Sequence, residues 1–308
     1  MIRKFLSGTF ALFAVFLFVS CVTLRRPQLT PEDEAVLYPV SSYIPESFDW
    51  QEVCPGISRF DYKNPGFPII YHAVKIDLSL AGLSLTCFPD ASQPQAENFR
   101  SIRTKTFAAR NNCVVAVNLS PFTGKNGAWN LAAKLGSQRT IVGLHVVDGQ
   151  ILSAAVPKYA AISFRKETSP DGLTTWRAFI DKSQSEKTAA NRDYAFGGFY
   201  VVLEQGVVQT GYNRTHDSRT GAGISDDGRT LYLLVVEGEN TLVSEGLSYP
   251  QCGEIFKAMG CTDALEMDGG GSSELCINGR SVLSYNNLRT QANSLGFVVK
   301  QDSAQVIE

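Results

Sequence analysis

Short apolar runs separated by turn residues fill most of the chain, and this pattern predicts β-strands. The run from Ile69 to Phe88 alternates apolar and polar residues and predicts a strand pair with a turn at Ala81-Gly82. Cys113 to Val117 is wholly apolar and predicts a buried strand. Ile141 to Leu152 predicts a hairpin, because Asp148-Gly149 in its middle is a strong two-residue turn signal. Two more strands are predicted over residues 160–164 and 174–180.

The C-terminal part shows the same pattern more regularly. Phe199 to Glu204 and Val207 to Thr210 predict a hairpin around Gln205-Gly206. Four further strands are predicted over residues 221–225, 231–236, 264–268 and 294–299.

Two segments predict helices. One runs from Glu97 to Arg110. The other begins at Ser248, which forms a capping box with Gln251, and it ends at Gly260. Many strands with few helices predict an α+β fold, a single domain built on a mixed β-sheet.

The N-terminus has the pattern of an export signal. Arg3 and Lys4 precede an apolar stretch from Phe5 to Val19, which is short for a membrane-spanning helix. Phe18-Val19-Ser20-Cys21 resembles a bacterial lipobox. This resemblance predicts that Cys21 is lipidated and begins the mature protein; an ordinary signal peptide with an incidental cysteine is the alternative.

These patterns divide the chain into three parts. Residues 1–21 are the predicted signal peptide and lipobox, residues 22–50 a tether rich in proline and charge, and residues 51–308 the folded domain. We therefore expect a protein of the bacterial cell envelope that lies outside the cytoplasm and is attached to the membrane through Cys21.

Composition and charge exclude some functions. The net charge of −2 gives no electrostatic reason to expect nucleic-acid binding. The chain has no HExxH and no C-x-x-C motif, so no metal site or other cofactor is predicted, although calcium at the acidic residues stays open. Beyond Cys21, the six remaining cysteines are compatible with disulfides and equally with buried free thiols.

Polar residues stand where several predicted strands end. Asn118 follows one strand, Glu237 follows another, and Asp268 leads directly into Gly269-Gly270-Gly271 and Ser272. Glycines let a ligand approach the backbone closely, and successive amides can form an anion-binding nest. A glycine-rich turn with a capping aspartate is the simpler alternative.

Basic residues gather just before the predicted strand at 221–225. They are Arg214, His216 and Arg219, followed by Thr220. Two carboxylates, arginines and glycine amides together suit acid–base chemistry on an anionic substrate, since arginine binds phosphate with a bidentate fork. The chain carries no G-x-S-x-G, P-loop or Rossmann motif, which argues against a serine hydrolase or a nucleotide-binding enzyme.

The order and spacing of four blocks resemble the phosphodiester glycosidase family. The blocks are Ser218–Gly223, Asp227–Gly238, Gly246–Ser248 and Asp263–Ser273. Asn293-Ser294-Leu295-Gly296 is similar to the closing block of that family. The resemblance implies an exported hydrolase that cleaves a sugar-1-phosphodiester into a free sugar and a phosphomonoester.

The resemblance also implies roles for individual residues. Asp268 and Glu237 are the expected acid, base or nucleophile. Arg219, helped by the amides of Gly269 to Gly271, is expected to hold the phosphate. Four residues are expected to orient hydroxyl groups or support the carboxylates: Thr220, Ser272, Asn118 and Asn293. Because strand ends on one edge of a sheet can share a pocket, we expect these side chains to converge on one cleft.

Some positions depart from the family pattern. The family usually has Asn-Gly-Gly-Phe-Phe where this chain has Asn118-Leu119-Ser120-Pro121-Phe122, and it has Asp at the position of Glu237. Two other functions therefore remain as alternatives. One is a non-catalytic, glycan-binding surface lipoprotein on the same scaffold. The other is an ordinary glycosidase that acts on envelope polysaccharide.

Overall fold

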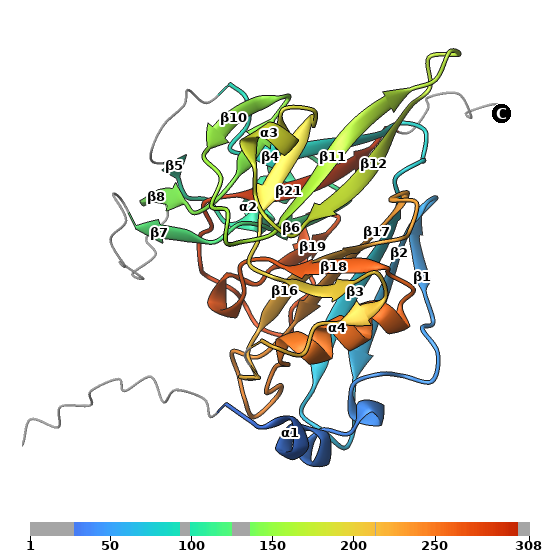
Figure 1. Cartoon of the computed structure of the whole chain (residues 1–308), viewed down its shortest axis with the longest axis vertical. Coiled ribbons are helices and arrows are strands. Elements are labelled where there is room, and N and C mark those ends of the chain that lie inside the picture. The colour runs from blue at the N-terminus through green and yellow to red at the C-terminus, as the bar shows by residue number, and fades with distance from the viewer. Residues whose placement is uncertain (1–27, 93–98, 125–135, 213, 301–308) are drawn as a thin grey trace, which may run out of the picture.

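The strands form four sheets in which the described pairings are all antiparallel (Figure 1). This computed structural model describes residues 28–92, 99–124, 136–212 and 214–300. Within those ranges the chain forms four α-helices and a single domain. The predicted α+β class with few helices is confirmed, and its strands are divided among several antiparallel sheets instead of one mixed sheet.

An eight-stranded sheet joins the two ends of the chain. Its order is β1-β2-β3-β17-β16-β18-β14-β15, so strands from the N-terminal part pair with strands from the C-terminal part. The strands are β1 (Gln51–Cys54), β2 (Ile57–Lys63), β3 (Ile70–Asp77), β14 (Val201–Glu204), β15 (Val207–Val208), β16 (Arg219–Ile224), β17 (Thr230–Val236) and β18 (Asp263–Glu266).

Three smaller sheets complete the domain. The β21 sheet has the order β20 (Arg280–Ser281), β19 (Leu275–Ile277), β6 (Val115–Asn118), β21 (Ser294–Val299) and β4 (Leu83–Phe88). The β13 sheet has the order β10 (Gln150–Ser153), β9 (His145–Val147), β13 (Tyr194–Gly197), β11 (Ala161–Thr168) and β12 (Thr174–Asp181). The third consists of β5 (Phe99–Arg100), β8 (Gln138–Ile141) and β7 (Phe122–Gly124).

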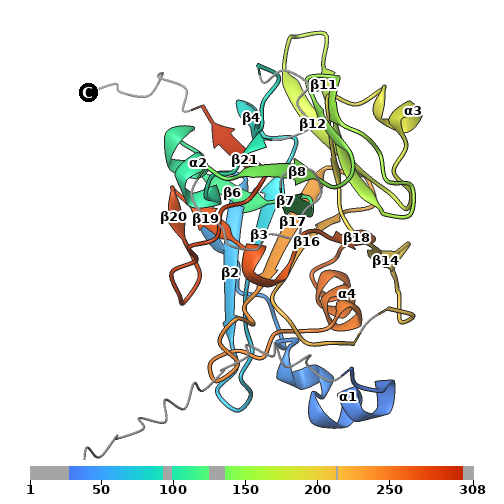
Figure 2. The ribbon, with the colours of Figure 1, turned by 90° about the vertical axis from the view of Figure 1, so that its left-hand side faces the viewer.

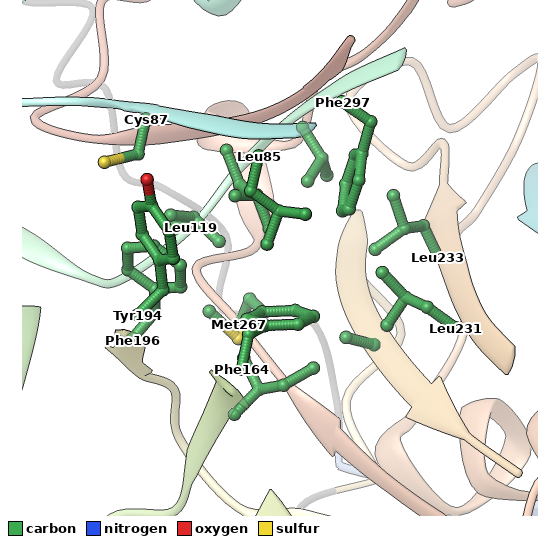
Figure 3. Packing of buried hydrophobic residues seen from close by; sticks show 14 of the residues in the cluster. Leu85, Cys87, Leu119, Phe164, Tyr194, Phe196, Leu231, Leu233, Met267 and Phe297 are labelled. Atoms are coloured by element: carbon green, nitrogen blue, oxygen red, sulfur yellow. The ribbon is translucent and has the colours of Figure 1, made fainter. Parts of the chain in front are cut away.

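The main hydrophobic core lies where the eight-stranded, β21 and β13 sheets meet (Figure 3). Leu233 of β17, Phe297 of β21 and Phe164 of β11 all contribute to it. Because side chains alternate along a strand, Leu231 and Leu233 face this core, whereas Leu234 of the same strand faces a second one. The central strand β17 is therefore apolar on both faces, which explains its uninterrupted apolar run.

Helix α4 (Tyr249–Ala258) covers the second core on the other face of the eight-stranded sheet (Figure 2). The predicted capping box of Ser248 and Gln251 is present. A Cβ atom at Gly221 or Gly223 of β16 would lie 2.9 or 2.7 Å from the ring of Phe256. The two glycines thus let the helix approach the sheet closely.

The segment predicted as a tether packs against the domain from Pro31 onward. Helix α1 (Pro31–Leu37) carries Glu34, a buried carboxylate that accepts hydrogen bonds from Arg214 and from His216 at 3.3 Å. Tyr43 is 3% exposed and belongs to the second core. Buried charge and apolar contacts therefore attach residues 31–50 to the fold, which a composition rich in proline and charge did not reveal.

Two other predictions differ from the structure in detail. Helix α2 covers only Thr104–Arg110, because Phe99–Arg100 pairs with β8; residues 97–98 lie outside the described residues. The predicted strands over 69–88 exist as β3 and β4, but they belong to different sheets. The turn at residues 81–82 therefore carries the chain from one sheet to another. The remaining short helix is α3 (Glu186–Ala189).

The six cysteines beyond residue 27 are all free thiols in the structure, and five of them are buried. Within the described residues, no helix is both long and apolar enough to cross a membrane. The predicted export signal, the lipobox and Cys21 lie outside the described residues.

Candidate active site

Asn118, at the end of β6, forms hydrogen bonds that hold the turn containing Asp268. Its Nδ2 donates to the main-chain oxygen of Asp268 at 2.7 Å. Its Oδ1 accepts from Thr220 Oγ1 at 3.0 Å and from the Glu274 amide at 2.9 Å. Asn118 and Thr220 are buried, so these hydrogen bonds replace water that neither side chain can reach. Asn118 thus holds the main chain of Asp268, and Thr220 holds Asn118; neither bonds the Asp268 carboxylate through these contacts.

The glycine run forms a tight turn directly after Asp268. Gly270 has φ +57° and begins a short 3-10 turn that ends at Ser272. The amide of Gly270 donates to the carbonyl of Ser218 at 2.8 Å, so it serves the fold and is not available to a ligand. The buried Ser272 hydrogen-bonds the Asp268 carboxyl. This contact gives Ser272 a supporting role, consistent with the sequence prediction.

The ionisation of Asp268 is strongly altered. Burial raises the pKa of Asp268 to about 7, although the Ser272 hydrogen bond and the charge of Arg289 act in the opposite direction. Asp268 nevertheless remains partly accessible to solvent. A carboxyl group with a pKa near neutrality can both donate and accept a proton, which is the property required of a general acid–base group.

An open pocket of about 460 Å³ lies beside the glycine turn. It is lined by Gly271 and Glu239 and by a polar loop that includes Tyr285 and Arg289. A Cβ atom at position 271 would lie 3.0 Å from Arg289 Nη1 and 3.5 Å from Glu239 Oε2. Glycine at this position therefore lets one cation and one carboxylate approach the turn from the same side.

Hydrogen bonds to the glycine turn fix the loop that carries Arg289. Asn287 Nδ2 donates to the carbonyls of Gly271 and Ser273 at 3.2 and 3.0 Å, and its Oδ1 accepts from the Arg289 amide at 2.9 Å. Gln291 Nε2 donates to the Ser272 carbonyl at 3.2 Å. The glycine turn is thus hydrogen-bonded to the loop on both sides of Arg289, at Asn287 and at Gln291. These bonds fix the position of Arg289 relative to Asp268 before any ligand binds.

A second guanidinium group lies near Arg289. The Cζ atoms of Arg139 and Arg289 lie 5.5 and 5.9 Å from the centroid of the Phe122 ring. Arg139 is only 3% exposed. Burial and the like charge of Arg289 lower the pKa of Arg139, which shows that the two cations influence each other. Such a pair favours an anion between or beside the two groups.

Glu237 occupies a different position from the one predicted. It is 2% exposed, and its carboxylate accepts from the Ser284 amide at 2.8 Å and from the Ser284 hydroxyl. His72 Nε2 lies 2.9 Å from Glu237 Oε1, and His72 Nδ1 lies 2.7 Å from Asp61 Oδ1. Glu237 is therefore engaged in an Asp61–His72–Glu237 chain, in which His72 and Glu237 are buried and Asp61 reaches the surface. This chain supports the start of the pocket loop, and Glu237 does not line the pocket.

The Asp61–His72–Glu237 chain is charged. Burial lowers the pKa of His72, but hydrogen bonds to Asp61 and Glu237 outweigh burial, so the pKa of His72 is raised. Burial likewise raises the pKa of Glu237, and the hydrogen bonds from His72 and Ser284 reverse this, so its pKa is lowered. Both shifts favour the ionised forms, a protonated His72 between two carboxylates.

Arg219 faces away from the pocket. Side chains alternate along β16, so Thr220 points toward Asn118 while Arg219 points toward α4. Its Nε donates to the Leu247 carbonyl at 2.9 Å, another nitrogen donates to the Thr215 carbonyl, and its Cζ lies 4.4 Å from the Tyr249 ring centroid. Arg219 therefore does not line the pocket, whereas Arg289, which the sequence analysis overlooked, does.

Asn293 is buried just before β21. Within the described part of the chain, neither its Oδ1 nor its Nδ2 has a hydrogen-bond partner. Gly269 precedes the 3-10 turn, where a Cβ atom would lie 2.8 Å from the Ser218 carbonyl. Of the predicted site residues in the described ranges, only Gly271 lines the pocket, and Asn118 and Thr220 are buried and bonded to each other and to the main chain of Asp268 or Glu274. Glu237 and Arg219 have structural contacts.

The sequence analysis missed Glu239, Arg289 and Arg139. Glu239 lies two residues after Glu237, so the Glu-Gly-Glu spacing could have pointed to it. Arg289 lies in a polar stretch before the Asn293 block and has no periodic signal of its own. Arg139 is distant in sequence from all blocks that resembled the family. Within the described residues, no group of three or more His, Cys, Asp or Glu side chains is arranged to hold a metal ion.

The model of the phosphodiester glycosidase family matches residues 111–298, which include every residue named at the pocket. The chain belongs to the phosphodiester glycosidase family. The family resemblance expected from the four sequence blocks is thereby confirmed, and the chain is a hydrolase of that family. No curated protein matches this phosphodiester glycosidase.

Solved structures share the fold of this phosphodiester glycosidase. A hypothetical protein from Synechocystis is 15% identical with a TM-score of 0.60; the match covers 82% of this chain and 64% of that protein. A Burkholderia pseudomallei protein is 16% identical with a TM-score of 0.54, covering 75% and 74% of the two chains. At these identities the similarity shows the fold alone.

A third similar structure is a zebrafish enzyme. It is the catalytic domain of N-acetylglucosamine-1-phosphodiester alpha-N-acetylglucosaminidase, auto-inhibited by its pro-peptide. The two chains are 18% identical with a TM-score of 0.56, and the match covers 85% of this chain and 86% of the zebrafish chain.

The Asn118 contacts predict that Asn118→Asp destabilises the domain more than Thr220→Val. Aspartate keeps an oxygen for Thr220 and Glu274 but sets a second oxygen against the Asp268 carbonyl. We expect a loss of about 3 kcal/mol for Asn118→Asp and about 1 kcal/mol for Thr220→Val in urea unfolding. Equal losses in the two variants would contradict the role of the Asn118 donor.

The Asp61–His72–Glu237 chain predicts a pH-dependent stability. The pKa of His72 is raised, so its contribution is complete below about pH 6.5 and is lost as pH rises through the folded pKa. The pKa of Glu237 is lowered, so its contribution is present above about pH 4.5 and is lost as pH falls. Glu237→Gln should therefore destabilise the domain by about 3 kcal/mol at pH 6 and by clearly less at pH 9.

Urea unfolding of the wild type and Glu237→Gln at both pH values measures this difference. Arg165→Lys serves as a control, because its partner Glu167 lies on the surface of β11. A destabilisation of Glu237→Gln that is the same at pH 6 and pH 9 would show that His72 carries no charge in the chain.

Proposed function

We propose that this phosphodiester glycosidase hydrolyses the bond between the anomeric carbon of a sugar and a phosphodiester, releasing a free sugar and a phosphomonoester. The observation that supports this proposal most is the position of Asp268. Its carboxyl group has a pKa near 7 and interacts with the charge of Arg289, and the glycine turn that follows it contributes Gly271 to an open pocket. The name of the zebrafish enzyme, N-acetylglucosamine-1-phosphodiester alpha-N-acetylglucosaminidase, agrees with this chemistry.

Arg289 and Arg139 are the groups that we assign to the phosphate. Their guanidinium carbons both lie near the Phe122 ring, at 5.9 Å (Arg289) and 5.5 Å (Arg139) from its centroid. Two neighbouring cations attract an anionic ligand, and a guanidinium can bind two phosphate oxygens at once. The glycine at 271 lets the phosphate approach Arg289 without a side chain in between.

The proton balance of the reaction suits Asp268. Hydrolysis breaks the bond from C1 to the phosphate oxygen, whose electron pair leaves with the phosphomonoester. Water supplies the hydroxyl group on C1 and releases one proton. Asp268 is the group assigned to transfer that proton, and Glu239 is the second carboxylate at the pocket. Because phosphate is a good leaving group, stabilisation of its charge by arginine contributes as much as proton transfer.

Asp268→Asn is expected to lower kcat on methyl N-acetyl-α-glucosaminyl 1-phosphate by about a hundredfold to ten-thousandfold. The amide keeps the shape of the side chain but cannot exchange a proton as a carboxyl group does. Arg289→Lys should instead raise KM about tenfold or more, because lysine keeps the charge and loses the bidentate fork. Steady-state kinetics with release of free sugar as the readout measure both changes.

Arg219→Lys tests whether Arg219 or Arg289 binds the phosphate. Arg165→Lys is the surface control. An increase in KM for Arg219→Lys but not for Arg289→Lys would show that Arg219, and not Arg289, binds the phosphate. Wild-type kcat in Asp268→Asn would mean that Asp268 only caps the turn. Cleavage of aryl glycosides but of no sugar-1-phosphodiester would favour an ordinary glycosidase instead.

We further propose that the enzyme is exported and lipid-anchored through Cys21. This proposal rests on the basic start, the apolar stretch and the lipobox-like residues before Cys21. Cys21→Ala is expected to abolish labelling with a palmitate analogue and to remove the protein from the membrane fraction. Recovery of the wild-type protein in the cytosol with residues 1–20 intact would contradict export.

A further inference from the structure

Five of the eight exposed large apolar side chains in the described residues belong to two short segments. Val36 and Leu37 end helix α1, and Val40 follows shortly after it. Leu242 and Val243 lie in the loop between β17 and α4. Val36 is 80% and Leu242 is 92% exposed, so water surrounds most of both side chains. We call these five residues the apolar surface.

Hydrogen bonds hold the two segments of the apolar surface together at one end of the eight-stranded sheet. The Tyr38 hydroxyl, directly after α1, donates to the carboxylate of Glu245, two residues after Val243. Ser244 Oγ donates to the Glu237 carbonyl at 2.6 Å and accepts from the amide of Ile70, the first residue of β3, at 3.0 Å. Both segments are therefore fixed where β3 begins and β17 ends. Figures 1 and 2 show α1 at this lower end of the molecule.

The apolar surface lies close in sequence to the proposed lipid anchor. Helix α1 begins at Pro31, ten residues after Cys21. Even fully extended, ten residues span at most about 35 Å. A lipid on Cys21 would therefore keep α1 within that distance of a bilayer in every anchored molecule. The β11–β12 hairpin, in contrast, lies at the opposite end of the molecule (Figures 1 and 2).

Apolar contact, and not charge, would attract this surface to lipid. Glu32 and Asp33 are exposed in the first turn of α1, and their carboxylates repel anionic headgroups. Exposed apolar groups of this kind mark contacts with membranes or with other proteins. The short chain from Cys21 favours the membrane, because it holds a bilayer within reach, whereas a second copy of the protein has to arrive by diffusion.

We propose that the apolar surface inserts into the headgroup region of the bilayer to which Cys21 attaches the protein. This rests on the lipid anchor proposed above and goes beyond it, because an anchor alone leaves the domain free to turn on its tether. Interfacial segments bury apolar side chains about 5–10 Å into the boundary between headgroups and acyl chains. Glu239, which lines the candidate pocket, lies three residues before Leu242 in the same loop. Insertion would therefore keep the pocket near the bilayer.

The test is tryptophan fluorescence of the protein, purified with its lipid and placed in phosphatidylcholine vesicles with or without bromine on the acyl chains. Val36→Trp and Leu242→Trp each place an indole in the apolar surface. Leu173→Trp is the matched control, because Leu173 is also exposed but lies in the turn between β11 and β12. Bromine quenches only a nearby indole. We expect quenching beyond that of the wild type, which has three tryptophans of its own, in Val36→Trp and Leu242→Trp but not in Leu173→Trp.

Quenching that is equal in all three variants, or no greater than in the wild type, would overturn the inference. So would a dimer in solution that Leu242→Ser dissociates, since the surface would then bind a second copy. Palmitate labelling and hydrolysis, measured on the same samples, separate this inference from the earlier proposals. If Cys21 is labelled but neither variant is quenched, the anchor stands and the surface fails; without label, both fail. If both variants are quenched but no sugar-1-phosphodiester is cleaved, the surface stands and the proposed hydrolysis fails.

Discussion

The contact between Asn118 and the Asp268 carbonyl is the constraint on which the candidate active site depends. Asn118 belongs to the β21 sheet, Thr220 to the eight-stranded sheet, and Asp268 to the turn that follows β18. One buried amide thus connects two sheets and the glycine turn. Because all these groups are shielded from water, the loss of one hydrogen bond leaves others unsatisfied. Arg289 depends on the same turn, since Asn287 and Gln291 bind its carbonyl groups.

The sequence did not show that Arg219 and Glu237 point away from the pocket, because it does not show to which face of the sheet a side chain points. A strand end predicts where a residue lies along the sheet, but the face to which its side chain points depends on register. Arg219 and Thr220 are neighbours in sequence and point to opposite faces of β16. Glu237 follows the end of β17 as predicted, but His72 on β3 and Ser284 in a loop distant in sequence both hydrogen-bond its carboxylate. No local pattern shows such partners.

Local signals predicted much of the fold. The hairpin at Asp148-Gly149, the capping box at Ser248 and the apolar run of β17 all appear at the expected places. Each depends on residues close in sequence, which is why it could be predicted. The pairing of β3 with β17, the packing of Glu34 against Arg214 and the approach of Arg289 to Asp268 depend on residues far apart. These contacts are set by tertiary packing, and only the family resemblance indicated that the C-terminal blocks share one site.

The order of strands in the eight-stranded sheet bears on how the chain folds during synthesis. Tyr71 of β3 pairs with Val236 of β17, so the centre of the sheet joins the first and last thirds of the polypeptide. Until β17 has emerged, β3 keeps one edge unpaired, and an unpaired edge readily associates with other chains. Contacts of such long sequence separation also form slowly. The sheet can therefore close only after β17 has been synthesised, and shielding of the early strands until then would protect this protein from aggregation.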